Sequence, residues 1–262
     1  MRVDLHNHTT LCNHASGTTK EYIQRAIELG VDIYGFSDHA PMKDFDPKYR
    51  MSLSQKDSYE KEILTLKEQY KNDIEILLGY EVDFLNGNYI LPEILNSKVD
   101  YLIGSVHFIN DGWGFDNPEF IGEYKNKNID DIWQDYFDAI KIMATKNCFD
   151  IVGHLDLIKV FKYLPKKDVK IIANDALKAI KKANMTLEIN SAGFRKPIGE
   201  QYPSIPLLEQ AYELDIPITF GSDAHSVDQV GFMYDEVVKI AKQIGYSKVA
   251  IYNNRDRKLV DI

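Results

Sequence analysis

Cysteine is scarce in this chain of 262 residues, which contains only Cys12 and Cys148. Two cysteines so far apart do not form the disulfide framework of a small secreted protein. Long apolar runs are also missing, and the opening MRVDLHNHTT lacks the apolar stretch of a signal peptide. We therefore expect a cytoplasmic protein with no membrane partner.

Basic residues are outnumbered, since 31 Lys and Arg face 40 Asp and Glu for a formal net charge of −9. No run of five basic residues offsets this balance, so a nucleic acid is a poor expected partner. Hydrophobic residues make up 44% and charged residues 27%, which is typical of a globular chain and excludes disordered or fibrous classes. The expected partner is a small molecule, and the sequence says nothing about oligomeric state.

Short β-type runs alternate along the chain with longer helical runs. We predict strands at 3–5, 31–36, 74–80, 99–106, 149–152, 185–189 and 216–220, with a further strand at 249–252. We predict helices at 18–30, 54–71, 92–96, 129–143, 168–183, 205–214 and 227–244, the second of them capped by Ser54. Seven strand-then-helix units indicate an α/β fold with parallel strands, either a closed barrel or an open sheet. No linker divides the chain, so residues 1–262 are predicted to form one domain.

The longest irregular stretch runs from residue 108 to residue 128 and is rich in Gly, Asn and Pro. A loop of this length in a compact domain is often functional.

The seven histidines are not scattered at random over the predicted elements. Six of them stand at the end of a predicted strand or just beyond it, as in VDLHNH, GFSDHA, GSVHF and IVGHLD, and His14 lies in the loop after the first strand. Glu81 and Asp223 occupy similar positions. Because the carboxyl ends of parallel strands meet on one face, these side chains are predicted to converge.

Imidazole and carboxylate groups are the usual ligands of zinc, iron and manganese. A single such histidine is more often a hydrogen-bonded residue at the edge of the core, but seven in equivalent positions favour a metal cluster. Catalytic zinc typically takes three protein ligands, so nine ligands predict three divalent ions, zinc, iron or manganese. The nine are His6, His8, His14, His39, Glu81, His107, His154, Asp223 and His225.

The ordered pattern of these motifs, from residue 4 to residue 226, resembles the PHP (polymerase and histidinol phosphatase) family. The resemblance implies a distorted, TIM-like (β/α)7 barrel with a trinuclear metal centre at the C-terminal ends of the strands. It assigns His6, His8, Glu81 and Asp223 to a first metal, and Glu81, His107 and His154 to a second that shares Glu81. His14, His39 and His225 would hold the third.

Within the family, the chain is similar to the stand-alone histidinol-phosphate phosphatases, through GYEVDF (79–84) and NSAGFRKPIGEQYPS (190–204). The second segment implies that Arg195 contacts the substrate phosphate. Relatives often carry an arginine shortly after the GHxDL segment, where this chain has Val160 between Lys159 and Lys162. Lys159 is therefore a candidate second phosphate contact, although lysine lacks the bidentate fork of arginine. Tyr202 and Trp113 either line the substrate pocket or pack as core.

The implied reaction is hydrolysis of L-histidinol phosphate to L-histidinol and phosphate in histidine biosynthesis, by a hydroxide held between two metals. Asp223 or His225 would donate the proton to the leaving group, and Arg195 would stabilise the developing charge. The alternatives are a PHP-type phosphoesterase for another small phosphate ester or for nucleotide 3′ ends, and a non-catalytic metal-binding module. Asp4 and Asp38 either orient neighbouring imidazoles or make local hydrogen bonds, and Cys12 is predicted to be a free loop cysteine.

Overall fold

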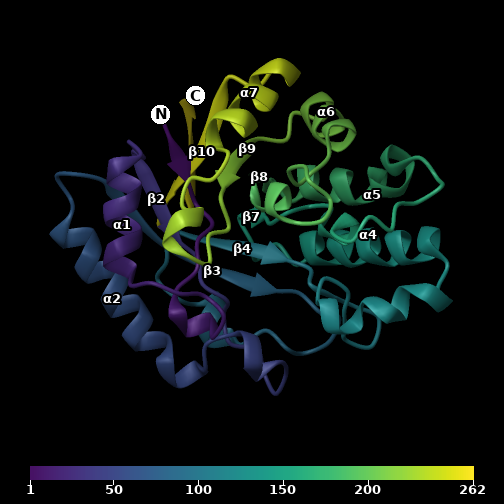
Figure 1. Cartoon of the computed structure of the whole chain (residues 1–262), viewed down its shortest axis with the longest axis horizontal. Helices are drawn as coiled ribbons and strands as arrows, with labels where there is room; N and C mark the ends of the chain where they lie inside the picture. The colour runs from purple at the N-terminus through teal and green to yellow at the C-terminus, as the bar shows by residue number, and fades with distance from the viewer.

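A barrel-shaped sheet of seven parallel strands forms the centre of the computed structural model, which describes residues 1–262 (Figure 1). The strand order is β1-β2-β3-β4-β7-β8-β9. The strands are β1 (Val3–Asp4), β2 (Ile33–Phe36), β3 (Glu75–Asp83), β4 (Tyr101–Ser105), β7 (Ile151–Val152), β8 (Thr186–Asn190) and β9 (Ile218–Gly221). The edge strands β1 and β9 meet, since the Leu5 amide donates to the Phe220 carbonyl at 2.9 Å and Asn7 pairs with Ala224. The sheet is therefore nearly closed, which confirms the predicted barrel over an open sheet.

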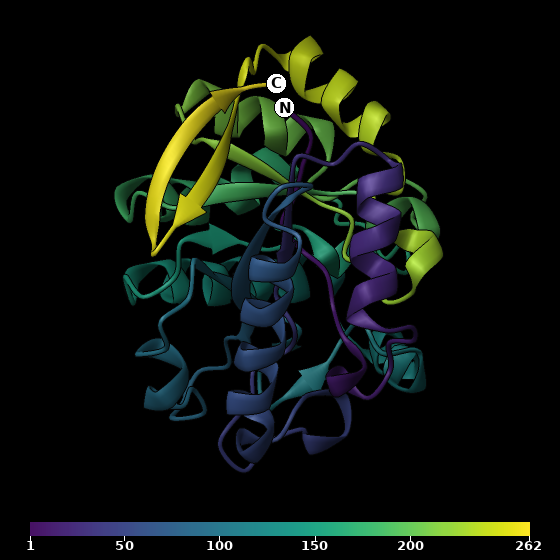
Figure 2. The same cartoon turned by 90° about the vertical axis from the view of Figure 1, so that its left-hand side faces the viewer.

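Helices surround this sheet in both views (Figures 1 and 2). They are α1 (Thr19–Glu28), α2 (Lys56–Gln69), α3 (Pro92–Leu95), α4 (Ile129–Thr145), α5 (Val169–Lys182), α6 (Ile205–Glu213) and α7 (Tyr234–Ile244). The ends of two helices follow directly from capping chemistry: Thr18 and Glu21 form a capping box at α1, and the Asp168 side chain accepts from the Lys170 amide at α5. None of the helices is both long and apolar enough to pass through a bilayer.

Apolar side chains from strands and helices merge into one core of 69 buried residues. Tyr101 is fully buried inside the barrel, and its hydroxyl donates to the Leu5 carbonyl at 2.6 Å. A methyl group added at Gly35 or at Gly79 would lie 2.1 Å or 2.6 Å from Tyr101 atoms, so these glycines make room for the ring. The single connected core agrees with one domain over residues 1–262, which remains a prediction.

Two predicted helix boundaries are wrong. The helix predicted at 227–244 is interrupted: a 3₁₀ turn covers Val227–Gln229, and α7 begins only at Tyr234 because Gly231 and Met233 have positive φ angles. Ser54 does not cap the second helix either. Ser52 caps a 3₁₀ turn at Leu53–Gln55, and α2 continues from it at Lys56.

Two short hairpins lie outside the barrel. The predicted strand at 249–252 is β10 (Lys248–Asn253), which pairs antiparallel with β11 (Asp256–Asp261) and flanks the sheet (Figure 2). The predicted irregular stretch at 108–128 contains the hairpin of β5 (Phe108–Ile109) with β6 (Trp113–Gly114), followed by a 3₁₀ segment at Pro118–Asn126. This second hairpin begins directly after His107, so it borders the carboxyl end of the barrel.

Candidate metal centre

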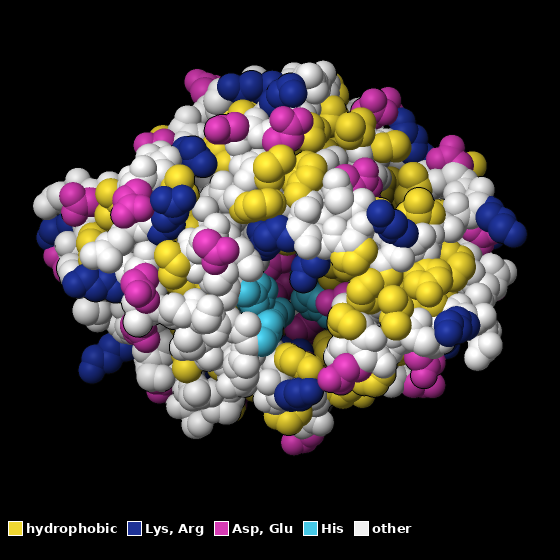
Figure 3. All heavy atoms as spheres, viewed as in Figure 1, with side chains coloured by type: hydrophobic (Ala, Val, Ile, Leu, Met, Phe, Trp, Pro, Cys, Tyr) yellow, Lys and Arg dark blue, Asp and Glu magenta, His cyan; other side chains and the backbone are white.

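All nine predicted ligands gather at the carboxyl end of the barrel. Eight follow from their place on a strand: His6 and His8 leave β1, His39 follows β2, Glu81 lies in β3, and His107, His154, Asp223 and His225 follow β4, β7 and β9. The ninth, His14, comes from the loop after β1. The space-filling view shows histidine side chains together with acidic ones at the bottom of a central hollow, with basic side chains near its rim (Figure 3). The convergence expected from the positions of these residues at strand ends is therefore present in the fold.

The Glu81 carboxylate occupies the centre of the cluster and is 1% exposed. Its Oε1 lies 2.9 Å from His154 Nε2 and 3.6 Å from His107 Nε2. Its Oε2 lies 3.0 Å from His39 Nδ1 and 3.4 Å from His6 Nε2. One carboxylate thus faces two groups of imidazoles through its two oxygens, which is the arrangement expected of a bridging ligand.

The residues assigned to the first metal surround one point. His6, His8 and Glu81 offer ligand atoms within 4.8 Å of one another. Asp223 joins them, since its Oδ1 lies 3.2 Å from His8 Nε2 and 3.9 Å from His6 Nε2. The Asp223 backbone is held in the left-handed region at φ 51° by the hydrogen bond from its amide to the His6 carbonyl at 2.7 Å. This strained geometry directs its carboxylate into the cluster.

The residues assigned to the third metal are also neighbours. The ring of His225 lies 4.6 Å from that of His14 and 6.2 Å from that of His39, between centroids. His225 also stacks on His8 at 4.0 Å and shares a group of ligand atoms within 4.8 Å with His8 and His39. His14 is the most exposed of the seven histidines, so this group lies at the open side of the centre.

Buried carboxylates behind the cluster orient the imidazoles. Glu188 Oε1 lies 2.7 Å from His6 Nδ1, Asp38 Oδ1 lies 3.3 Å from His8 Nδ1, and Asp83 Oδ1 contacts His107 Nδ1. Of the two roles considered for Asp38, the structure shows contacts of both kinds, since its carboxylate also accepts from the Thr9 and His39 amides. Asp4 does not orient an imidazole: its carboxylate accepts from the amide and hydroxyl of Ser222.

Two residues that support the cluster, Glu188 and Arg50, are absent from the sequence predictions. Glu188 is an ionisable residue in the buried strand TLEIN. Because buried glutamates are rare without a partner, its position in this strand could have indicated a functional role. Arg50 is 4% exposed and donates to Asp83 Oδ2 at 2.8 Å, which fixes the carboxylate that contacts His107. No local pattern marks Arg50, because it lies in a loop 33 residues from its partner.

The buried carboxylates of the cluster need positive charge nearby. Burial alone raises the pKa of Glu81, but His6, His39 and His107 hold it well below its usual value. Burial lowers the pKa of His6, yet Glu188, Glu81 and Asp223 raise it well above the ordinary value. Protons on the imidazoles thus balance buried carboxylates wherever no other cation is present. A divalent ion can take the place of these protons.

The unpaired ring nitrogens of the cluster show whether its residues are suited to bind metal ions. Buried ring nitrogens of five histidines have no hydrogen-bond partner, namely His6 Nε2, His8 Nε2, His39 Nδ1, His154 Nδ1 and His225 Nε2. Buried polar atoms without partners are rare in proteins and need an explanation. His8, His39 and His225 offer ligand atoms within 4.8 Å of one another, as do His6, His8 and Glu81, so a metal ion explains unpaired nitrogens here and the residues fit a site for divalent ions.

Gly221 makes the Glu188–His6 contact possible, and its replacement is a test of it. A Cβ at this position would lie 2.1 Å from Glu188 Oε1 and 2.6 Å from His6 Cβ. We expect Gly221→Ala to lower the free energy of unfolding by about 1–3 kcal/mol, as for other overpacked sites, and to reduce metal content. Urea unfolding and elemental analysis measure both. Gly122→Ala is the matched control, since nothing lies within 4 Å of a Cβ there; equal behaviour of the two variants would contradict the prediction.

Arg195 reaches the cluster from the loop after β8. Its Nη2 donates to the carbonyls of Ser222 and Asp223, each at 2.9 Å, whereas Nη1 is buried without a partner. Tyr202 forms another wall: its ring lies 6.4 Å from that of His154, and its buried hydroxyl has no partner. Two free donors therefore border the cluster, where an anionic ligand could accept from them.

Lys159 lies near the same wall but is engaged elsewhere. Its Nζ is 3.0 Å from Asp156 Oδ2 and donates to Glu200 Oε1 and to the Gln201 carbonyl, each at 2.8 Å. The residue is 1% exposed. A phosphate contact by Lys159, expected from sequence, therefore requires it to leave one of these partners and stays a prediction.

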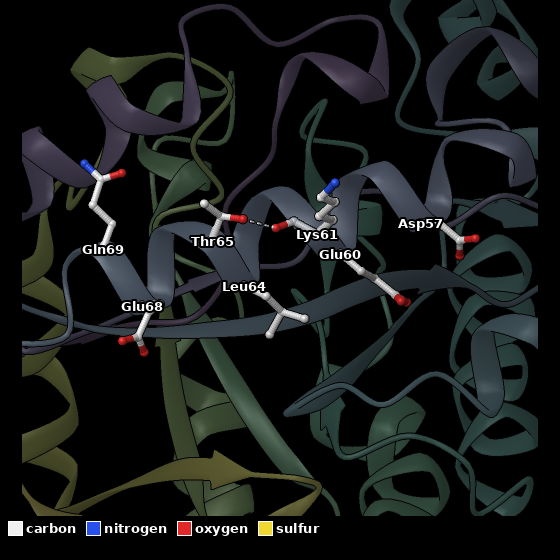
Figure 4. Close-up of a pocket in the computed structure, with 7 residues that line it drawn as sticks. All are labelled: Asp57, Glu60, Lys61, Leu64, Thr65, Glu68 and Gln69. Carbon is white, nitrogen blue, oxygen red and sulfur yellow. Dashed lines mark hydrogen bonds between the residues drawn. The ribbon is translucent and has the colours of Figure 1, made fainter.

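A second hollow lies on the outer surface of α2, away from the histidines (Figure 4). A single helix supplies all of its lining, and only Leu64 is apolar. The Thr65 hydroxyl donates to the Lys61 carbonyl at 2.7 Å, which is a local helix contact. With no convergent unpaired groups, this hollow is not the candidate site. The lining residues are Asp57, Glu60, Lys61, Leu64, Thr65, Glu68 and Gln69.

Comparisons with known proteins place the chain among metal-dependent hydrolases. The family model described as "PHP domain" matches residues 4–192, and the model "PHP-associated" matches residues 208–244. A Deinococcus radiodurans protein named "Probable histidinol-phosphatase" is 38% identical over 259 residues, covering 98% of this chain and 97% of that protein. The Bacillus subtilis protein named "Histidinol-phosphatase" is 29% identical, covering 88% and 96%.

A solved structure shares the fold. The histidinol phosphate phosphatase from Lactococcus lactis, complexed with zinc, L-histidinol and phosphate, superposes with a TM-score of 0.81 at 23% sequence identity. The match covers 98% of both chains. The whole barrel is therefore common to the two proteins.

Proposed function

The chain belongs to the PHP family, and from this membership and the geometry of its strand-end cluster we propose that it hydrolyses L-histidinol phosphate to L-histidinol and phosphate. The observation that carries the proposal is the convergence of nine ligands around the buried Glu81, with the unpaired Nη1 of Arg195 beside them. Relatives named histidinol-phosphatase along nearly the full length support the substrate.

The proposed cofactors are three divalent ions, zinc, iron or manganese. His6, His8, Glu81 and Asp223 would hold the first, Glu81 with His107 and His154 the second, and His14 with His39 and His225 the third. Bound divalent ions supply Lewis acidity, which lowers the pKa of coordinated water and neutralises phosphate charge. Zinc in the Lactococcus lactis relative supports the choice of a divalent metal.

The protein's own groups bind the ester and place its charges. The Arg195 guanidinium is fixed by two carbonyls through Nη2, so Nη1 can donate to a phosphate oxygen without reorganising. The Tyr202 hydroxyl keeps its proton, because burial and nearby carboxylates raise its pKa, and it can donate a second hydrogen bond. Asp223 or His225 would hold the proton that the leaving alkoxide needs. We propose that the protein is located in the cytoplasm, as expected for an enzyme of histidine biosynthesis.

Phosphate release from a panel of esters tests the proposed function. We expect metal-replete protein to hydrolyse L-histidinol phosphate with a kcat/KM at least about a hundredfold above simple monoesters such as p-nitrophenyl phosphate. A difference of this size corresponds to about 2.7 kcal/mol of discrimination in the transition state. Higher rates on another small phosphate ester or on a nucleotide 3′ phosphate would instead identify a different PHP-type phosphoesterase.

A further inference from the structure

We propose that Asp116, on the segment that follows the β5–β6 hairpin, binds the α-ammonium group of the substrate and thereby selects phosphate esters of amino alcohols. This inference rests on the proposed function, since it concerns the same site and deepens its specificity. Nothing in the pattern of metal motifs includes Asp116, which lies 38 residues before the next predicted ligand, His154.

The hairpin places Asp116 beside the second group of ligands. Phe108, the residue after His107, pairs with Gly114 across the hairpin, so the chain returns toward His107 just before Asp116. The Phe115 ring then packs edge-on against Tyr136 at 5.2 Å. The Tyr136 hydroxyl in turn donates to the His154 carbonyl at 3.4 Å. The segment that leads into Asp116 is thus tied to the residues assigned to the second metal.

The electrostatic surroundings of Asp116 agree with this placement. Burial raises the pKa of its carboxyl group, and the imidazoles of His107 and His154 oppose that shift. Asp116 also acts on the buried hydroxyl of Tyr202, whose pKa it raises together with that of Tyr124. These mutual effects agree with the placement of Asp116 by the hairpin, near the second ligand group and the Tyr202 hydroxyl.

Asp116 is half-buried and has no hydrogen bond or ion pair with another residue. Three other carboxylates close to the cluster each have an ion-pair partner within the protein: Asp83 pairs with Arg50, Asp156 with Lys159 and Glu188 with His6. A partly desolvated carboxylate without a partner costs free energy, which an external cation can recover. Asp116 is thus the available anionic contact on this wall.

Of the groups of L-histidinol phosphate, the ammonium is the one that fits Asp116. Its nitrogen is separated from the ester oxygen by only two carbons, whereas the imidazole ring lies one carbon further away. An ester phosphate held at the metals and Arg195 therefore keeps the ammonium close to the second ligand group, where Asp116 stands. Hydrogen bonds between charged groups are about twice as strong as neutral ones, so this contact can determine specificity.

Kinetics on paired esters test the assignment. The pairs are L-histidinol phosphate with 3-(imidazol-4-yl)propyl phosphate, and L-phenylalaninol phosphate with 3-phenylpropyl phosphate, each pair differing only in the amine. We expect Asp116→Asn to lower kcat/KM about 10- to 100-fold on the two amine-bearing esters, as for loss of a charged hydrogen bond. On the two deaminated esters we expect less than a twofold change. Metal content should be unchanged, and Asp111→Asn, exposed on the same hairpin, should behave as wild type.

Two results would overturn the proposal. An equal loss on esters with and without the amine would assign Asp116 to the metals or to folding, and metal analysis would then separate those roles. Unchanged kinetics on all four esters would remove Asp116 from the substrate site. The proposed function fails separately, if wild-type protein shows no preference for the imidazole-bearing esters over the phenyl ones; the amine effect can still be read from the phenyl pair.

Discussion

Glu81→Gln is expected to abolish nearly all phosphatase activity and to lower the metal content by at least one ion per chain. The amide keeps the shape of the carboxylate but removes the negative charge that faces both the His6 and the His154 imidazoles. Breaking a buried ion pair typically costs about 3–5 kcal/mol, which corresponds to a loss of roughly 10²–10⁴ in an equilibrium constant. Steady-state kinetics and elemental analysis measure the two effects.

A control for this variant lies on the same strand. Glu75 is exposed at the start of β3, so Glu75→Gln changes the same chemistry without touching the cluster. We expect it to retain wild-type activity and metal content. If Glu81→Gln kept both as well, Glu81 would not be a shared ligand, and the division of the nine residues into three groups would be wrong.

Arg195→Ala is expected to reduce kcat/KM about 10²–10³-fold, the usual effect of removing one donor to a developing oxyanion. The buried Nη1 has no partner in the protein, and the guanidinium is held over the Phe232 ring at 5.2 Å, so the group is already positioned for a ligand. Because burial lowers the pKa of Arg195, an anion beside it is favoured. Initial rates over a range of substrate concentrations separate the effects on kcat and KM.

Arg195→Lys distinguishes charge from geometry. Lysine restores the charge but cannot hold two carbonyls with one nitrogen and donate to phosphate with another, so we expect recovery of no more than about tenfold. Lys196→Ala is the control, since Lys196 is the exposed neighbour in the same loop. Full activity of Arg195→Ala would show that the phosphate is held without this side chain.

The histidine positions show which features of the site can be predicted from local sequence patterns. A strand followed by a small residue and a histidine, as at His39 and His154, places the imidazole at the carboxyl end whatever the rest of the chain does. Parallel pairing then brings such residues together, so the cluster follows from the alternation of strands and helices. The helix caps at Thr18 and Asp168 were likewise predictable, because each involves residues within one turn.

Other features depended on distant partners. Glu188 orients His6 across 182 residues of chain, and nothing near either residue indicates the other. Lys159 was expected at the phosphate, but its ammonium is held by Glu200 from a loop 41 residues away. The interruption before α7 involves Met233 at φ 51°, a conformation that single-residue preferences do not predict for methionine.

The sequence by itself therefore determined the α/β alternation, the placement of nine candidate ligand residues at one end of it, and the family to which their order belongs. These properties are local: each depends on the period of apolar residues and on the residue that follows a strand. The tertiary structure alone decided the closure of the sheet between β1 and β9. It also decided which carboxylates support which imidazoles, and which charged groups, Arg195 and Asp116 among them, remain free for a ligand. Those outcomes depend on contacts between segments far apart in the chain, where the geometry of the whole barrel fixes the distances.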